Sequence, residues 1–174
     1  MKIVLVGYMG SGKTTVGKLL ARDLDLNFLD LDTYLQEKTQ MPVPAIFKEK
    51  GEIYFRKMEH LYLKEILEER ENFVLSTGGG APCYSGNMQT ILEGTNHVFY
   101  LKLSIDGLVR RLIPEMDGRP LIRNLSLDEL PEFIGKHLFE RNPYYTMANH
   151  TISCDGKDPN EIMEEIKEFL NKPL

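Results

Sequence analysis

The first stretch of the chain suited to chemistry is a glycine-rich segment, Gly7-Tyr8-Met9-Gly10-Ser11-Gly12-Lys13-Thr14. It matches the pattern G-x-x-x-x-G-K-[ST], whose glycines let the backbone curl so that successive N–H groups point inward at phosphate oxygens. In such a loop we expect Lys13 to reach the β- and γ-phosphates and the Thr14 hydroxyl to hold Mg²⁺. The alternative is a chance glycine-rich turn. The pattern predicts a nucleoside triphosphate as phosphate donor, and leaves the acceptor open.

Two carboxylates, Asp30 and Asp32, end the run Phe28-Leu29-Asp30-Leu31-Asp32. Residues two apart in a strand point to the same face, so we expect both to project from the carboxyl edge of a sheet, where α/β proteins bind ligands. One would serve the metal through water, and the other would accept a proton from an attacking hydroxyl. The alternative is that one or both cap the helix that starts near Thr33.

Three arginines and a glycine triplet are candidates for binding anions. Arg56 and Glu59 lie three apart on a predicted helix face, where a surface ion pair is the plain alternative. Arg141, at the end of a long helical stretch, would usually be a surface residue. Arg119 lies in a loop rich in Pro and Gly, where an arginine either closes over a γ-phosphate or is merely solvated. The Gly78-Gly79-Gly80 triplet follows a strand and allows close backbone approach to a ligand, or forms only a tight turn.

The elements that must position these residues alternate between strand and helix. Short runs rich in β-branched residues predict strands over 2–6, 28–31, 73–76, 97–101 and 150–153. Helical spacing of apolar residues predicts helices over 13–24, 33–70, 85–92 and 104–112, the second of them broken near 41–44 and around Gly51. Two more helices are predicted, one after a capping box of Ser126 and Glu129, and a last one through Ile162 and Leu170. This alternation indicates a parallel sheet covered on both sides.

Length and composition fit one domain without repeats or linkers. The chain has 174 residues and a formal net charge of -5, which argues against a general nucleic-acid binder. No stretch approaches the roughly 18 apolar residues of a membrane span. Cys83 and Cys154 lack metal-ligand spacing, and we expect free thiols in a reducing cytoplasm. The four histidines also lack such spacing and are expected to be structural or surface residues: His60, His97, His137 and His150.

Taken together, these motifs resemble those of the shikimate kinase family, from Gly7 to about Pro159. The matching segments are the phosphate loop, the Asp30 and Asp32 pair, Val43-Pro44-Ala45-Ile46-Phe47, Phe55-Arg56-Lys57-Met58-Glu59, the glycine triplet, Arg119-Pro120-Leu121, and Arg141 with Pro143 and Tyr145. The resemblance implies an α/β fold, a three-layer α/β/α P-loop kinase with a five-stranded parallel sheet of order 2-3-1-4-5. It implies a single domain over 1–174, with an acceptor-binding helical region at about 33–60 and a lid loop at about 114–124 that closes on substrate binding.

The resemblance also implies Mg²⁺-dependent transfer of the γ-phosphate of ATP to the 3-hydroxyl of shikimate, by a cytoplasmic monomer that binds neither nucleic acid nor membrane. The implied catalytic residues are Lys13, Asp32 as candidate base and Arg119 as lid arginine. Implied ATP contacts are Gly10, Ser11, Gly12, Lys13, Thr14, Thr15, Arg111, Arg119, Lys157 and Pro159, with Arg111 and the Lys157 loop on either side of the adenine. Implied shikimate contacts are Asp32, Phe47, Phe55, Arg56, Gly78, Gly79, Gly80 and Arg141, the two arginines binding its carboxylate. Thr14 and Asp30 would serve one Mg²⁺ ion.

One departure and two alternatives accompany this interpretation. The family often has Glu two residues after the tyrosine, whereas Tyr145 is followed here by Thr146 and Met147. A different acceptor within the same fold, as in a gluconate kinase or a nucleoside monophosphate kinase, is the first alternative. The second is a catalytically inactive nucleotide-binding module, which we would expect to have lost acceptor or lid residues. A panel of acceptors and an ADP-release assay would separate the three.

Overall fold

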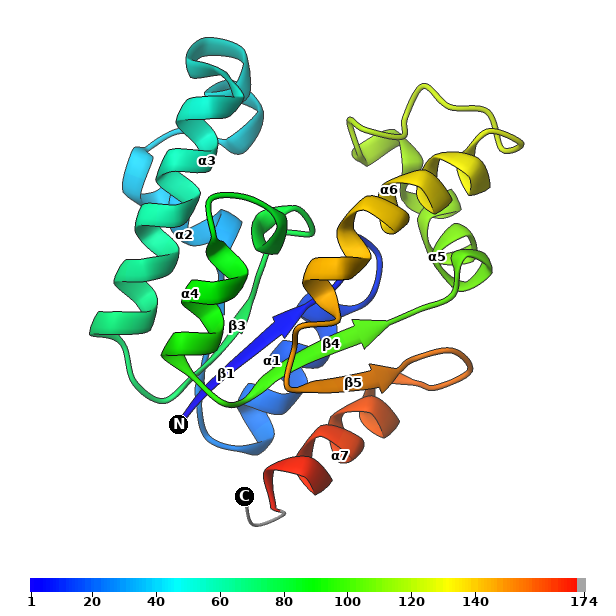
Figure 1. Ribbon diagram of the computed structural model, residues 1–174. Coiled ribbons are helices and arrows are strands. Elements are labelled where there is room, and N and C mark those ends of the chain that lie inside the picture. The colour runs from blue at the N-terminus through cyan, green and yellow to red at the C-terminus, as the bar shows by residue number, and fades with distance from the viewer. Residues whose placement is uncertain (172–174) are drawn as a thin grey trace.

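Five strands form a single parallel sheet in the order β2-β3-β1-β4-β5 (Figure 1). The structure is a computed structural model that describes residues 1–171. Its strands are β1 (Lys2–Val6), β2 (Asn27–Asp30), β3 (Phe73–Ser76), β4 (Val98–Lys102) and β5 (His150–Ser153). The predicted fold class, the sheet order and all five strands are confirmed. The bounds of β2 and β4 differ from the predicted ones by one residue at each end.

The central strands are continuous apolar runs because helices cover both faces of the sheet. Residues Ile3 to Val6 of β1 and Phe73 to Leu75 of β3 are completely buried, as expected of strands in the middle of a parallel sheet. The edge strand β2 is only partly buried. β1 and β3 therefore form the rigid centre from which the loops at the carboxyl edge leave.

Seven α-helices and two short 3₁₀ helices surround the sheet within residues 1–171. They are α1 (Lys13–Asp23), α2 (Leu31–Thr39), α3 (Val43–Glu69), η1 (Ala81–Cys83), α4 (Asn87–Gly94), α5 (Ile105–Leu112), η2 (Ile113–Gly118), α6 (Leu130–Tyr145) and α7 (Pro159–Leu170). Helices α1 and α7 pack together on one face, and α3, α4 and α6 cover the other (Figure 1). None of these helices combines the length and the apolar character that crossing a membrane requires.

The helical stretch predicted over 33–70 is interrupted near 41–44 as predicted, since α2 ends at Thr39 and α3 begins at Val43, but α2 begins earlier than expected. The Asp30 carboxylate accepts a hydrogen bond from the Thr33 amide at 3.1 Å, which makes Asp30 the N-cap of α2. Asp32 therefore lies in the first turn of α2, and its predicted position on the strand was wrong. The predicted break at Gly51 is confirmed, because this residue has φ 85° and ψ 171° inside α3.

Three further boundaries differ from the prediction for local reasons. Ser85 and Gly86 have positive φ angles, so α4 begins at Asn87 instead of at Ser85. The capping box is present, with the Ser126 amide donating to Glu129 at 2.8 Å, but a turn separates it from the start of α6 at Leu130. The first half of the predicted irregular loop 114–124 is instead ordered as η2.

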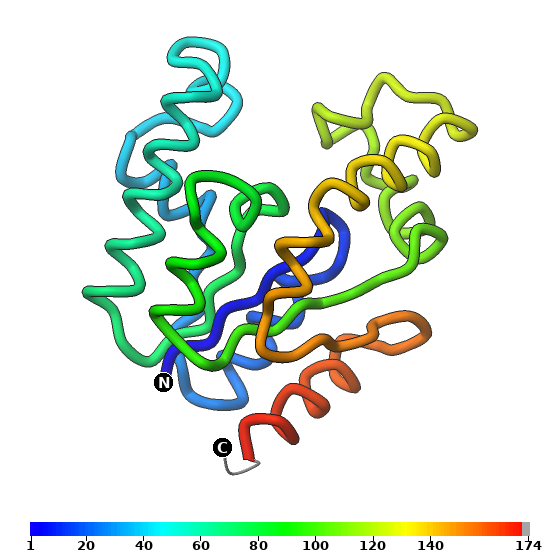
Figure 2. Tube along the Cα trace, viewed as in Figure 1, coloured from blue at the N-terminus to red at the C-terminus, as the bar shows by residue number. Residues whose placement is uncertain are grey.

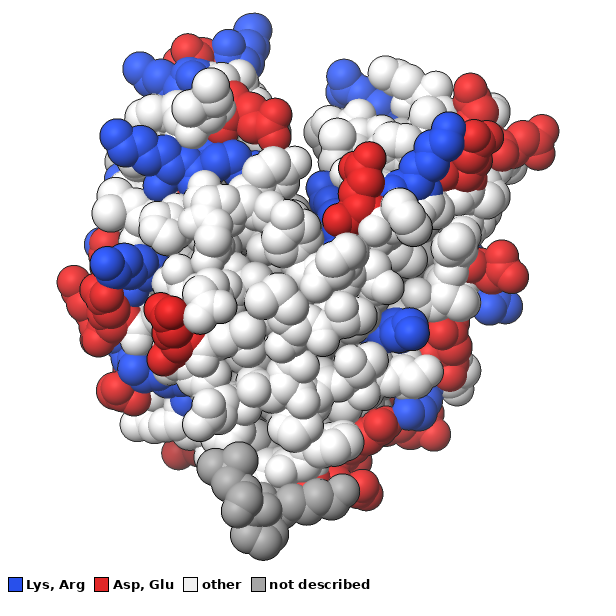
Figure 3. Space-filling view, in the orientation of Figure 1, with Lys and Arg blue, Asp and Glu red and all other residues white. Residues whose placement is uncertain are grey.

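Two parts of the chain rise above the carboxyl edge of the sheet. One is α2 with the beginning of α3, and the other is the segment 113–129, which leads into α6 (Figure 2). In the space-filling view the surface is hollowed between these two parts (Figure 3). This cleft opens directly over the ends of β1, β2 and β3.

Candidate active site

The sheet register brings the ends of three strands together beneath the cleft. Asp30 of β2 pairs with Ser76 of β3, and Ser76 pairs in turn with Leu5 of β1. A cavity of about 530 Å³ lies at this edge. It is lined by Met9, Gly10, Gly12, Lys13, Thr14, Thr15, Asp30, Asp32, Ser76, Thr77, Gly78, Gly79, Arg111, Glu115 and Arg119. Most of the residues predicted to bind ATP or the metal therefore share one cavity.

The phosphate loop between β1 and α1 has the backbone that its glycines predict. Gly7, Gly10 and Gly12 have φ angles of 146°, 79° and 95°, which L side chains rarely adopt. A Cβ on Gly7 would also lie 2.8 Å from the carbonyl oxygen of Leu101. Among the described residues, no side chain caps the start of α1 at Gly12. Its first amides are therefore open to an anion, and the helix dipole favours negative charge there.

Lys13 is buried at the centre of this loop. Its ammonium donates hydrogen bonds to the carbonyl oxygens of Gly7 at 2.7 Å and Tyr8 at 2.9 Å. Burial is the main cause that lowers the pKa of Lys13 to about 7; Arg119 lowers it further, and Asp32 opposes the shift. The phosphates of a nucleotide would favour the charged form and supply a stronger partner than these carbonyls.

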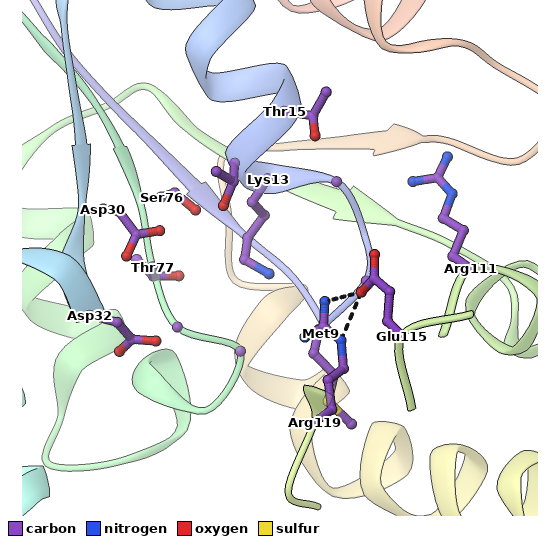
Figure 4. A pocket seen from close by; sticks show the side chains of 15 residues that line it. Met9, Lys13, Thr15, Asp30, Asp32, Ser76, Thr77, Arg111, Glu115 and Arg119 are labelled. Atoms are coloured by element: carbon purple, nitrogen blue, oxygen red, sulfur yellow. Dashed lines mark hydrogen bonds and ion pairs between the residues drawn. The ribbon is translucent and has the colours of Figure 1, made fainter. Parts of the chain in front are cut away.

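Asp30 and Asp32 lie on one side of the cavity, with Lys13 between them and the lid arginine (Figure 4). Asp30 caps α2, as the alternative predicted, and it also lines the cavity, while its service to the metal stays a prediction. Burial raises the pKa of Asp32, the neighbouring Asp30 charge raises it further, and Lys13 and Arg56 act in the opposite direction. A carboxylate in such surroundings is a better proton acceptor than an exposed one.

The glycine triplet lies against both candidate acceptor arginines. A Cβ on Gly80 would lie 2.9 Å from Nη2 of Arg56 and 3.4 Å from Nη2 of Arg141, and one on Gly78 would lie 3.3 Å from the Asp32 carboxylate. Only 8% of Arg141 is exposed, and 16% of the Arg56 side chain. The surface alternatives for these two arginines are therefore wrong. Two guanidinium groups and one carboxylate converge on three glycines.

Arg56 is held in a fixed orientation by its neighbours. Its Nη1 donates to the buried Glu59 carboxylate at 2.8 Å, as the spacing of the two residues suggested. The ring of Tyr84 covers one face of the guanidinium, with 3.9 Å between the ring centroid and Cζ, and the Phe55 ring lies at 5.1 Å. These contacts leave the guanidinium little freedom to turn away from the cleft.

A second cavity of about 530 Å³ lies beside the first, between α3, the segment 113–129 and α6. It is lined by Val43, Pro44, Phe47, Glu52, Arg56, Tyr84, Pro120, Leu121, His137 and Arg141. Phe47 therefore lines this cavity as predicted. Phe55 is 4% exposed and packs against Phe47, with 4.5 Å between the centroids of the two rings. Apolar walls and two guanidinium groups suit a compact organic anion.

Arg119 and Arg111 reach the first cavity from the lid side. Nε of Arg119 donates to the Glu115 carboxylate at 2.8 Å (Figure 4), and Nη1 of Arg111 donates to the carbonyl oxygen of Ser11 at 3.1 Å. Lys157 and Pro159 are not among the described residues that line this cavity. Lys157 is paired with Glu165, and Pro159 begins α7. Their contact with adenine stays a prediction.

Several residues of the two cavities escaped the sequence interpretation: Ser76, Thr77, Tyr84, Glu115 and His137. Ser76 and Thr77 could have been found, because Ser76 ends the strand that precedes the glycine triplet and Thr77 follows it directly, so both must lie at the carboxyl edge. Tyr84 and His137 carry no such signal. Each reaches its cavity only through packing between segments far apart in the chain.

The oxygen atoms at the first cavity suit a magnesium ion. Thr14 and both aspartates line it, and Mg²⁺ prefers oxygen ligands and keeps several waters, so it requires few ligands from the protein. Residues 1–171 contain no group of three or more His, Cys, Asp or Glu side chains that could hold a metal ion. This donor set fits an ion held mainly by a nucleotide and water.

A phosphate loop and an anion-binding cavity meeting over a parallel sheet of this order define a P-loop kinase of small molecules. The family model "Shikimate kinase" matches residues 9–171. A shikimate kinase of Flavobacterium psychrophilum is 48% identical over 169 residues, which are 97% of this chain and 98% of the relative. The chain belongs to the shikimate kinase family.

Solved structures agree with this assignment. A crystal structure of shikimate kinase from Bacteroides thetaiotaomicron has a TM-score of 0.91 at 39% identity and covers 99% of both chains. A shikimate kinase from Acinetobacter baumannii, solved in complex with shikimate, has a TM-score of 0.85 at 33% identity over 97% of this chain and 92% of that one. A deoxyadenosine kinase from M. mycoides, at 16% identity and a TM-score of 0.59, shares the fold alone.

Proposed function

We propose that this chain transfers the γ-phosphate of ATP to the 3-hydroxyl of shikimate, giving shikimate 3-phosphate and ADP. The observation that carries the proposal is the convergence of Arg56 and Arg141 on the glycine triplet, beside Asp32 and next to the phosphate loop. Shikimate is a compact hydroxylated ring with one carboxylate, which suits the two arginines and the apolar walls of the second cavity. The Acinetobacter baumannii relative supports this acceptor, because it was solved with shikimate.

On the acceptor side, each group has a separate task. Arg56 and Arg141 bind the carboxylate, and a planar guanidinium provides paired hydrogen bonds that fix the orientation of the ring. Phe47 forms an apolar wall of the cavity. Asp32 lines the first cavity beside Gly78 and accepts the proton of the attacking hydroxyl, a role that its burial favours.

On the donor side, the backbone amides of the phosphate loop bind the β- and γ-phosphates of ATP. Lys13 gives up its carbonyl partners and stabilises the charge that develops on the transferred group. Arg119 exchanges Glu115 for the γ-phosphate as the lid closes, and closure excludes water that would otherwise compete as acceptor. A Mg²⁺ ion served by Thr14 and Asp30 would neutralise part of the phosphate charge.

The two cavities together hold a residue for every role in this proposal, so the site needs no second copy of the chain, and we propose that the monomer is the active form. The two thiols, Cys83 and Cys154, are free, which fits the reducing cytoplasm that we propose as its location. Size-exclusion chromatography with light scattering would test the first statement. An active species found only as a dimer would contradict it.

A coupled assay of ADP release, run with a panel of acceptors, tests the proposed function. We expect turnover with shikimate and little with gluconate or nucleoside monophosphates. Lys13→Met should abolish turnover, and Asp32→Asn should reduce kcat by about 100-fold or more, the usual contribution of a general base. Turnover of gluconate or a nucleotide in place of shikimate would reject the assignment, and full activity of Asp32→Asn would remove this residue from the role of base.

A further inference from the structure

Tyr8 stands at a variable position of the phosphate loop, and its side chain has no part in binding phosphate. Only 1% of the residue is exposed, so it is one of the largest fully buried side chains of the described structure. Its backbone belongs to the donor site, because its carbonyl oxygen accepts hydrogen bonds from Lys13 at 2.9 Å and from the Ser11 amide at 3.1 Å. Any shift of Tyr8 would therefore move atoms that hold Lys13.

The side chain of Tyr8 makes its polar contact on a different element. Its hydroxyl is hydrogen-bonded to Nδ1 of His137, on α6, at 2.9 Å. The two rings meet edge to face, with centroids 5.6 Å apart. This contact spans 129 positions of the sequence, and it joins the loop after β1 to the helix that follows the lid segment.

His137 and Arg141 lie four residues apart on α6, so they occupy neighbouring positions on one face of the helix. Both line the second cavity, which we assign to the acceptor. The Arg141 guanidinium also lies over the Tyr8 ring, with 5.6 Å between Cζ and the ring centroid. The ring of Tyr8 thus contacts Arg141 directly. The hydroxyl of Tyr8 holds His137, which lies one helical turn before this arginine.

We propose that Tyr8 and His137 form a positioning pair, which ties the phosphate loop to α6 and holds Arg141 at the place where the acceptor carboxylate binds. The inference rests on the proposed function, because it assigns Arg141 to the carboxylate. The pair touches none of the reacting atoms. It fixes the distance between the donor and acceptor sites, on which a direct transfer of phosphate depends.

Kinetics of Tyr8→Phe test the pair, since this variant keeps the ring over Arg141 and removes only the hydroxyl. We expect the KM for shikimate to rise about 2- to 10-fold, the value of one hydrogen bond. The KM for ATP should change less than twofold. His137→Leu should act in the same direction. The double variant should be no worse than the more affected single variant, because both remove the same interaction.

Two further variants separate positioning from general stability. His137→Gln keeps a hydrogen-bonding group opposite the tyrosine and should restore most of the shikimate affinity. Tyr34→Phe removes a comparable buried hydroxyl, bonded to Glu65 at 2.6 Å far from α6, and should lower Tm without changing the KM for shikimate. An unchanged KM for shikimate in Tyr8→Phe, or additive effects in the double variant, would overturn the proposal.

Failure of the proposed function would be recognised separately, in the wild type. If the wild type phosphorylated a different carboxylate acceptor, the shikimate assignment would fail, and the same five variants would test the pair with that acceptor. If the wild type bound shikimate without turnover, its dissociation constant would replace KM as the measured quantity. In each case a loss confined to the acceptor supports the pair, and an unchanged acceptor affinity contradicts it.

Discussion

At the scale of single residues, Lys13 couples nucleotide binding to a proton. Burial and Arg119 lower its pKa to about 7 in the free protein. Above that pH the free protein increasingly carries a neutral Lys13, whereas bound phosphates favour the charged form. Binding must then take up a proton, so the affinity for nucleotide falls as the pH rises through about 7 and beyond.

Titration calorimetry with a non-hydrolysable ATP analogue at pH 8 would measure this uptake. In two buffers with different ionisation enthalpies, the observed heats of binding should differ. The difference, divided by the difference between the two ionisation enthalpies, gives the proton uptake, which we expect to be a large fraction of one proton. Lys13→Arg is the matched control, because arginine stays charged throughout this range and should show no buffer dependence from this site. Equal heats for the wild type in both buffers would contradict the lowered pKa.

The aspartate pair shows which features of the site residue types and spacing can predict and which they cannot. Asp30 and Asp32 were expected on one face of a strand, and both do line one cavity. The strand, however, ends at Asp30, because its carboxylate caps α2 and starts the helix there. A hydrogen bond to the Thr33 amide decided the local structure, and the spacing of two residues could not show whether it forms.

At the scale of elements, the kink in α3 positions the wall of the acceptor cavity. Gly51 has φ 85° and ψ 171°, a conformation open almost only to glycine. The turns before it carry Val43, Pro44 and Phe47, which all line the cavity. The kink therefore directs these side chains into the cleft, while the longer second part of the helix packs on the sheet.

Replacing Gly51 by alanine would strain this backbone, although nothing lies within 4 Å of the added Cβ. We expect Gly51→Ala to lower the free energy of unfolding by about 1–3 kcal/mol and to raise the KM for shikimate. Gly135→Ala, in the regular part of α6, should instead stabilise the protein by up to about 1 kcal/mol. Thermal unfolding and kinetics of both variants would check this; equal stability of Gly51→Ala and the wild type would contradict it.

The lid segment shows why loops are harder to predict than helices. Its Pro and Gly content predicted irregular structure over 114–124, and the first half is η2 instead. Two features order it: a local ion pair between Glu115 and Arg119, four residues apart, and Ile122, which is completely buried in the core. Ile122 anchors the segment at a point that no local pattern marks, so the lid closure that we propose would be restricted to the residues around Arg119.

At the scale of the whole molecule, the sheet order decides that donor and acceptor sites share one cleft. The alternation of strands and helices predicted a parallel sheet, while the order 2-3-1-4-5 followed only from the family resemblance. Likewise, nothing in the spacing of Arg56, the glycine triplet and Arg141 predicts that they meet. Their convergence depends on α3 and α6 covering the same face of the sheet, which is a property of the complete fold.

A crystal structure of the protein with shikimate and ADP would show directly whether the acceptor binds between the two arginines and the phosphate loop. We predict the shikimate carboxylate within hydrogen-bond distance of both Arg56 and Arg141, the 3-hydroxyl beside Asp32, and the ADP phosphates on the amides of the phosphate loop. Shikimate bound elsewhere, or with its carboxylate away from these two arginines, would contradict the assignment of the second cavity and the function built on it.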